Sequence, residues 1–305
     1  MSDGRTGLSF WWVDVFATRA AVSGNRLMVF VPATSVWEDE AVCRRIAAEV
    51  AFSEVTFLVP DDGREDAGAY RCRIFTPAEE LAFAGHPTLG SAVVWALETA
   101  PMVERLRLDQ RSAGASVSVA VERRPGEIGH MAFMAAPEVA FAPPPEAAAV
   151  ARALGVERSD LEPDGLGAAV AVGPTRQLLV PVRREALGAM SPDGRALAAL
   201  SLGTGWTAVY AFSPPGADGR LEARGFAPAL GIAEDPATGS AAAYLARYLA
   251  ARGRLEVGGR LVVEQGRHVG RPSELHLARP GADEVEVGGS VRAVARGHLL
   301  PDFLA

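Results

Sequence analysis

The feature of this sequence that most constrains its fold is a short pattern that occurs twice. Residues 86–92 (HPTLGSA) and residues 235–241 (DPATGSA) match at Pro, Gly, Ser and Ala. Each copy follows a Phe-x-Pro, at residues 75–77 and 226–228. The first copy opens residues 88–97, which are apolar almost all round, as in a buried helix. The pattern predicts two similar halves, each with a buried central helix. Because seven positions are few in a chain rich in glycine and alanine, chance similarity stays open as the alternative.

Length and composition agree with two domains. The chain has 305 residues, of which 49% are hydrophobic and 22% charged, enough for two cores of ordinary size. Strand-like and helical stretches are mixed in both halves, so we expect an α+β fold. We place the boundary shortly before the proline-rich residues 142–145, which gives domains of residues 1–127 and 128–305. The last strand, about residues 289–305, is a candidate to return to the first half.

The charge balance indicates which partners to expect. The formal net charge is -7, so the chain lacks the basic field that nucleic acid or an anionic membrane surface requires. It contains no stretch of roughly 20 apolar residues, and residues 1–7 are polar, without the apolar run of a signal peptide. We therefore expect a cytoplasmic protein with neither nucleic acid nor membrane as a partner.

Several kinds of chemistry are excluded by missing residue types. All 30 basic residues are arginine, which excludes a lysine Schiff base and a P-loop lysine. Cys43 and Cys72 predict neither a disulfide framework nor a cysteine metal cluster. Residues 165–170 (GLGAAV) lack the third glycine of a dinucleotide-binding motif and precede a predicted strand. Four histidines have no partner at metal-ligand spacing, so no metal is expected: His130, His268, His276 and His298.

Two polar residues precede prolines at the predicted starts of the central helices. Asp235 before Pro236 is a favourable N-cap, and His86 before Pro87 is a similar case. A helix start also offers free N–H groups and the positive end of the helix dipole, which together bind anions. Small residues there, namely Gly85, Gly239 and Ser240, would let a carboxylate approach the main chain. Capping and substrate binding are both open for these positions.

Glu54 lies in a stretch, residues 51–59, that we predict as a strand. Strict alternation would place its side chain on the half-apolar face shared by Phe52, Thr56 and Leu58. A solvated strand position is the ordinary interpretation of such a glutamate. If the site is enclosed, loss of hydration would raise its pKa toward neutrality, which suits a general base that must return its proton.

Several segments, in order along nearly the whole chain, resemble one known family. Residues 73–87 (RIFTPAEELAFAGHP) carry the strongest likeness. Shorter segments agree with it: residues 13–16 with Gly24-Asn25, residues 53–57 (SEVTF), residues 234–242 (EDPATGSAA), residues 264–266 (EQG) and residues 270–273 (GRPS). Together they identify the chain as similar to the PhzF-like isomerases.

The resemblance implies a diaminopimelate epimerase-like fold of two pseudo-symmetric halves. Each half would be a curved, mostly antiparallel sheet wrapped around a central helix, with the site between the halves. It also implies that Glu54 is the general acid/base and that His86 and Asp235 assist it. The main chain around Gly85, Gly239 and Ser240, with Asn25, would hold the substrate.

The activity that the resemblance implies is a cofactor-independent isomerisation. The best-known member moves a proton between carbons of trans-2,3-dihydro-3-hydroxyanthranilate during phenazine synthesis. A small carboxylate would be the substrate, and a homodimer the expected assembly. Related racemases use two cysteines at the starts of the central helices, but Cys43 and Cys72 lie elsewhere in the sequence, so a two-thiol mechanism is not expected.

One residue departs from the family pattern. The usual Gly-Asn-Pro of the first turn is Gly24-Asn25-Arg26 here. Arg26 could point to solvent or reach an acidic substrate, and we favour solvent because exposed arginine is the common case. Two alternatives stay open: an isomerase or epimerase with another small-acid substrate, and a non-catalytic protein that binds a small acid.

Overall fold

The computed structural model describes residues 7–33, 36–61, 68–113, 115–123, 129–202, 204–300 and 303. These residues form two compact units. Unit 1 comprises the chain up to Arg19, Asn25–Ala135 and the part from Gly288 onward, and unit 2 comprises Ala20–Gly24 and Ala136–Val287. The expected boundary near residue 128 falls in residues 124–128, outside the described residues. The units part after Ala135 because the strand that ends there pairs within unit 1.

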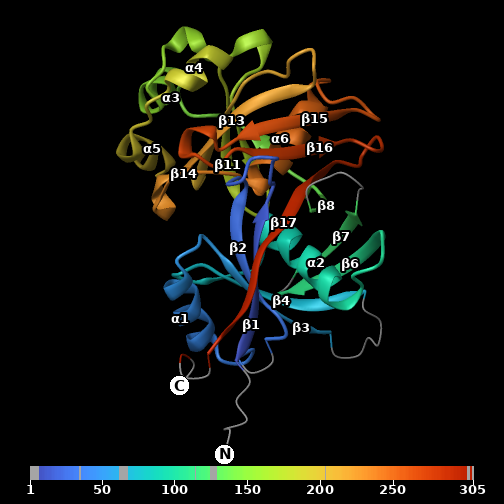
Figure 1. The fold of residues 1–305 in the computed structure, drawn as a ribbon. Helices are drawn as coiled ribbons and strands as arrows, with labels where there is room; N and C mark the ends of the chain where they lie inside the picture. Colours follow the sequence, from blue (N-terminus) through green and yellow to red (C-terminus); the bar gives the residue numbers. More distant parts are fainter. Residues whose placement is uncertain are drawn as a thin grey trace, which may run out of the picture. The chain divides into compact units, whose positions relative to one another are not determined.

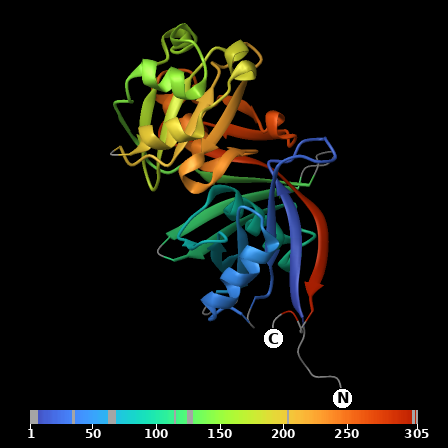
Figure 2. The ribbon, with the colours of Figure 1, turned by 90° about the vertical axis from the view of Figure 1, so that its left-hand side faces the viewer.

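Unit 1 is a closed barrel built from eight of the described strands (Figure 1). They are β1 (Leu8–Val15), β2 (Asn25–Phe30), β3 (Val55–Pro60), β4 (Ala69–Phe75), β6 (Arg105–Ser112), β7 (Ala115–Arg123), β8 (His130–Ala135) and β17 (Glu286–Leu299). Neighbours pair in that order, antiparallel except for the parallel pairs β2–β3 and β4–β6. The pairings of β17 with β8 and with β1 close the ring, and β1, β2 and β17 run side by side in both views (Figure 2).

Helix α2 (Gly85–Thr99) fills this barrel and contacts most of its strands. Every residue from Gly85 to Ala96 is buried, which confirms the buried helix predicted from its uniformly apolar sequence. Gly90 faces Leu27 and Val15 so closely that an added Cβ would lie 2.5 Å and 3.0 Å from their methyl groups. The absence of a side chain at Gly90 therefore allows the helix to approach β1 and β2.

The strand expected at residues 51–59 is shorter than predicted. Helix α1 (Glu40–Val50) ends at Ala51, whose φ of 54° is left-handed, and β3 begins only at Val55. All residues from Val55 to Val59 are buried, because α1 and its cluster cover one face while α2 covers the other. Thr56 faces α2, where its hydroxyl accepts a hydrogen bond from Ser91. Because both faces of β3 are buried, its sequence shows no alternation of polar and apolar residues.

Unit 2 repeats the order of strand pairings around a second helix, α6 (Gly239–Ala251). Its strands are β9 (Ala140–Ala142), β10 (Ala169–Val172), β11 (Arg176–Pro181), β12 (Ala208–Phe212), β13 (Arg220–Ala227), β14 (Ile232–Asp235), β15 (Arg260–Gln265) and β16 (Ser273–Ala278). The pairs β10–β11, β12–β13 and β15–β16 are antiparallel, and β11–β12 and β13–β15 are parallel. The series β1–β2–β3–β4–β6–β7 in unit 1 has the same sequence of orientations.

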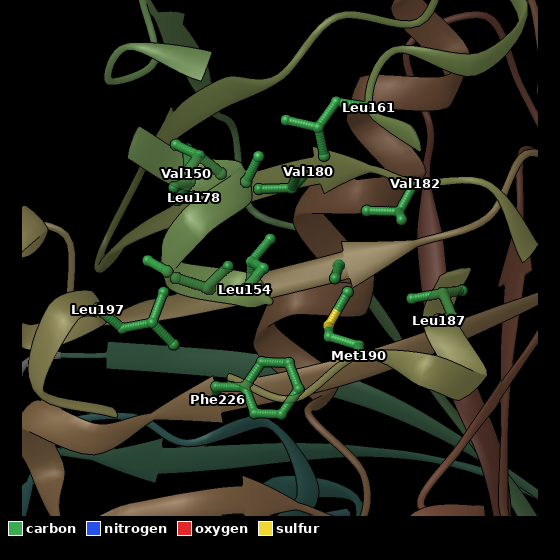
Figure 3. Packing of buried hydrophobic residues seen from close by; sticks show 14 of the residues in the cluster. Val150, Leu154, Leu161, Leu178, Val180, Val182, Leu187, Met190, Leu197 and Phe226 are labelled. Atoms are coloured by element: carbon green, nitrogen blue, oxygen red, sulfur yellow. The ribbon is translucent and has the colours of Figure 1, made fainter. Parts of the chain in front are cut away.

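Three further helices cover the sheet of unit 2, and their apolar faces form its outer core. They are α3 (Ala147–Leu154), α4 (Arg184–Ala189) and α5 (Gly194–Ser201). Figure 3 shows Leu154, Leu187 and Leu197 from these helices packed with strand residues such as Val180 and Phe226. Short 3₁₀ turns complete the unit: η1 (Arg158–Asp160), η2 (Pro163–Gly165), η3 (Pro228–Leu230) and η4 (Arg267–Val269). None of the helices in the described parts of the chain has the length and apolarity needed to span a membrane.

The two central helices do not begin at equivalent points of the repeated seven-residue pattern. Gly85 is the first residue of α2 and Gly239 the first residue of α6, whereas the pattern paired Gly239 with Gly90. A better correspondence is Arg73-x-Phe75-x-Pro77 with Arg224-x-Phe226-x-Pro228 on the strands that precede the helices. The helix starts therefore do not support the register of the seven-residue pattern.

Candidate active site

Unit 1 brings together two of the predicted catalytic residues. His86 is the second residue of α2, and its Nε2 lies 3.7 Å from Oε2 of Glu54. Their side chains are only 7% and 17% exposed. Glu54 follows the left-handed turn at Ala51, which redirects the chain after α1 and places Glu54 immediately before β3, next to His86 at the start of α2. Because β3 begins only at Val55, Glu54 lies outside the strand and the expected alternation does not apply to it.

Burial controls the acidity of Glu54. Loss of hydration raises the pKa of its carboxyl group above the ordinary value of 4.5, and a hydrogen bond from Ser53 lowers it in part. Its buried Oε2 has no hydrogen-bond partner among the described residues. A carboxyl group in these surroundings can take up a proton and release it again more readily than a solvated glutamate, which is a requirement for acid/base catalysis.

The remaining predicted residues of unit 1 lie at the start of β2 and at the start of α2. Asn25 is buried and pairs with Val15 across β1 and β2, directly after Gly24, whose φ of 75° forms the turn. Gly85 is the first residue of α2, whose N-cap Ala84 provides no side-chain hydrogen bond. Its N–H belongs to the group of helix-start donors that have no partner within the helix.

Arg26 points outward, as we favoured from the sequence. The residue is exposed, and its guanidinium carbon lies 4.8 Å from the ring centroid of Phe52. The Phe52 ring packs in turn against Trp12, with the two ring centroids 5.5 Å apart. A cation placed over an aromatic face is weakly stabilised, so Arg26 needs no acidic partner to hold its position.

Unit 2 places Asp235 at the end of β14, not at the helix start expected for an N-cap. The N-cap of α6 is Thr238, which lies three residues later. Oδ2 of Asp235 accepts a hydrogen bond from the Thr238 hydroxyl at 2.7 Å. The intervening Pro236 and Ala237 form a turn between strand and helix, so the carboxylate stands before α6 and its capping role was wrongly predicted.

Gly239 and Ser240 are the first two residues of α6. Ser240 is half-buried, and its hydroxyl accepts a hydrogen bond from Gln177 Nε2 on β11 at 2.9 Å. An added Cβ at Gly225, on the neighbouring strand β13, would lie 2.6 Å from the Thr238 hydroxyl, so this helix start is closely packed. Asp235, Thr238 and Ser240 therefore form one polar group at the start of α6.

Sequence reasoning missed several polar residues of this group. Four polar side chains form hydrogen bonds around the start of α6, those of Gln177, Tyr210, Thr238 and Gln265. Thr238 and Gln265 lie in segments that carry the family resemblance, residues 234–242 and 264–266, but neither of them could be assigned a role from the sequence. Buried glutamine and tyrosine on strands are not recognisable as functional without the contacts they make.

Metal and thiol chemistry find no support in the part of the chain that the structure describes. It contains no group of three or more His, Cys, Asp or Glu side chains arranged to hold a metal ion.

Burial raises the pKa of both Cys43 and Cys72 to about 12. Both cysteines lie in unit 1, on α1 and β4. A thiol with so high a pKa carries almost no thiolate at neutral pH and is a poor nucleophile or base.

The fold, built around two central helices, is similar to that of solved epimerases. A hydroxyproline epimerase from Agrobacterium vitis, at 15% identity, shares the fold with a TM-score of 0.59 over 97% of this chain and 91% of its own. A predicted epimerase from Pseudomonas aeruginosa is 35% identical and has a TM-score of 0.80, covering 97% and 99% of the two chains.

The sequence comparisons are more specific. Residues 13–297 match the family described as phenazine biosynthesis-like protein (PhzC-PhzF). The trans-2,3-dihydro-3-hydroxyanthranilate isomerase of Pseudomonas chlororaphis is 33% identical over 292 residues, which cover 94% of this chain and 98% of the relative. The chain therefore belongs to the phenazine biosynthesis-like PhzC-PhzF family, whose relatives found here include named isomerases.

Proposed function

We propose that this protein is a cofactor-independent isomerase that moves a proton between carbons of a small cyclic carboxylic acid. The observation that carries the proposal is the buried Glu54 carboxyl group beside His86, with a pKa raised by burial. The name of the 33% identical relative makes trans-2,3-dihydro-3-hydroxyanthranilate the first substrate to test. We further propose that the enzyme works in the cytoplasm as a homodimer, without nucleic acid or membrane partners, and that its two units are pseudo-symmetric versions of one architecture.

The roles of the residues follow from their chemistry. Glu54 abstracts the proton from one carbon and returns it to another, since its raised pKa brings uptake and release closer to balance. His86, 3.7 Å away, can donate or accept a proton and can polarise the substrate. Asp235 assists through the carboxylate that accepts a hydrogen bond from Thr238.

Substrate binding is assigned to main-chain groups at the two helix starts. The N–H groups around Gly85 and around Gly239 and Ser240 belong to helix N-termini, which favour a carboxylate through free donors and the helix dipole. Asn25, buried at the start of β2, supplies an amide that can hydrogen-bond a polar substituent. Arg26 lies exposed against Phe52, so the proposal gives it no catalytic part.

The test is proton exchange in deuterated water with trans-2,3-dihydro-3-hydroxyanthranilate and a panel of cyclic amino and hydroxy acids. We expect isomerisation of at least one acid with deuterium gained at carbon. In Glu54→Gln, which keeps the shape and removes the base, turnover should fall at least roughly a hundredfold while binding persists. Variants His86→Asn and Asp235→Asn should lose less, because these residues assist.

Two results would contradict the proposal. Binding of an acid without any exchange at carbon would indicate the alternative of a non-catalytic binding protein. Exchange at the parent rate in Glu54→Gln would remove Glu54 from the mechanism. Turnover of another panel acid in place of the anthranilate would instead identify an isomerase with a different substrate.

A further inference from the structure

The side chain of Gln265, at the end of β15, is buried and uses its full hydrogen-bonding capacity. Its Nε2 donates to the main-chain oxygen of Asp235 at 2.8 Å and to the Thr238 hydroxyl at 3.0 Å. Its Oε1 accepts from the Tyr210 hydroxyl at 2.8 Å and from the Thr238 main-chain N–H at 3.1 Å. A carboxamide has two donor hydrogens and two acceptor lone pairs, so these four bonds fix its orientation.

The direction of each bond determines the next one. Because Nε2 of Gln265 can only donate, the Thr238 hydroxyl oxygen must be the acceptor in that bond. The single proton of this hydroxyl is then directed to Oδ2 of Asp235, 2.7 Å away. Tyr210, Gln265, Thr238 and Asp235 thus form an ordered relay of donors that ends on the carboxylate.

The neighbouring strand leaves room for the relay. Gly225 on β13 pairs with Asp235 on β14. An added Cβ there would lie 2.6 Å from the Thr238 hydroxyl and 3.0 Å from Gln265 Nε2. A side chain at position 225 would therefore displace the Thr238 hydroxyl and the Gln265 amide, which both hydrogen-bond to Asp235.

Unit 1 contains a relay of the same composition. The buried Tyr70 hydroxyl donates to Gln110 Oε1 at 3.0 Å, and Gln110 Nε2 donates to the Thr88 hydroxyl at 3.1 Å. The Thr88 hydroxyl donates to the main-chain oxygen of Ala84, the N-cap of α2, at 2.8 Å. Both relays lead from a tyrosine through a glutamine and a threonine to the start of the central helix, but only the relay in unit 2 ends on a carboxylate.

We propose that the Tyr210–Gln265–Thr238 relay holds the Asp235 carboxylate in the orientation that the reaction requires. Gln265 and Thr238 are positioning residues, since they act on the substrate only through Asp235. The inference rests on the proposed function, because it gives Asp235 a part in proton handling.

The first test separates turnover from binding. In Thr238→Val, which keeps the shape and removes the hydroxyl, kcat should fall by roughly tenfold to a hundredfold, as expected for a lost hydrogen bond to a charged group, with KM within about threefold. Thr238→Ser restores the hydroxyl and should recover most of the lost kcat. Equal losses in the valine and serine variants, or a parent-like kcat in Thr238→Val, would overturn the proposal.

Tyrosine variants supply a matched control. Tyr210→Phe removes the first donor of the relay and should lower kcat several-fold. Tyr248→Phe removes another buried hydroxyl of unit 2, one that donates to the Gly167 main-chain oxygen at 2.5 Å outside the relay. Both variants should lose stability, but Tyr248→Phe should keep kcat within about twofold. A similar fall of kcat in both variants would show that the effect is only structural and would contradict the proposal.

A crystallographic measurement decides the positioning role even if no acid is turned over. In Thr238→Val the Asp235 carboxylate should leave its place beside residue 238, and in Thr238→Ser it should return. An unchanged Asp235 side chain in Thr238→Val would overturn the relay. Absence of turnover in the parent protein would overturn the proposed function without affecting this result.

Discussion

At the scale of single residues, Glu54 links the chemistry of the site to the stability of the fold. Its pKa is raised in the folded state because ionisation would place a charge in a buried position. The folded protein therefore holds this proton to higher pH than the unfolded chain does, whose glutamates titrate near about 4.3. Stability falls as pH rises through the folded pKa, since the folded state must then carry a buried charge.

We therefore predict that Glu54→Gln is more stable than the parent at neutral and alkaline pH. The difference in Tm should be small near pH 4, where the carboxyl group is mostly protonated in both states, and should grow as pH rises. Thermal unfolding of both proteins across that range measures it. A constant difference in Tm at every pH would show that the ionisation of Glu54 does not contribute.

Site residues could be proposed from the sequence only where they lie in a distinctive local segment. Glu54 and His86 each lie in a distinctive segment of the sequence, and the structure brings them within 3.7 Å of each other. The capping role of Asp235 was wrong because a turn of two residues separates it from the N-cap Thr238. Gln265 acts through contacts with β12, β14 and the start of α6, which no local pattern records.

At the scale of elements, the central helices depend on close packing at few positions. The predicted helix at residues 88–97 proved to be α2, but its approach to β1 and β2 at Gly90 could not be foreseen. Each central helix also follows a strand whose arginine binds a glutamate through two hydrogen bonds. These pairs are Arg73 with Glu80 and Arg224 with Glu234. The arginine and the glutamate are separated by a different number of residues in each pair. A shared sequence pattern therefore does not reveal these pairs.

Two glycine substitutions should have opposite effects. Gly90→Ala would bring a Cβ within 2.5 Å of the buried Leu27, and such overpacking costs about 1–3 kcal/mol. Gly188→Ala, on the exposed face of α4 with no atom within 4 Å of the added Cβ, should gain about 0.4–1 kcal/mol. Chemical denaturation of the two variants tests both values. Stabilisation by Gly90→Ala would mean that α2 is packed more loosely than the structure shows.

At the scale of the whole molecule, unit 1 is built from segments distant in the sequence. Strand β17 pairs with β1 and with β8 and buries Val291 in the barrel. No local sequence pattern supports the expectation that a late strand returns to the first half, since pairing between strands so far apart leaves no local signal. The part from Gly288 onward packs in unit 1.

Removing the chain from Gly288 onward should open the barrel of unit 1. Strands β1 and β8 would each lose a partner, so their amides should exchange hydrogen much faster. Strands β11 and β12, which pair within unit 2, should keep their protection. Hydrogen exchange followed by mass spectrometry compares the two proteins. Unchanged protection of β1 and β8 would show that the barrel does not need β17.

The late position of β17 also has a consequence for synthesis on the ribosome. Domains usually fold in the order in which they emerge, N-terminal part first. Here most strands of unit 1 emerge early from the ribosome. Their partner β17 is translated only after unit 2. Unit 2 can therefore complete its sheet while β1 and β8 still have open edges. Such edges bind other chains readily, so we expect nascent unit 1 to depend on chaperones until β17 has been made.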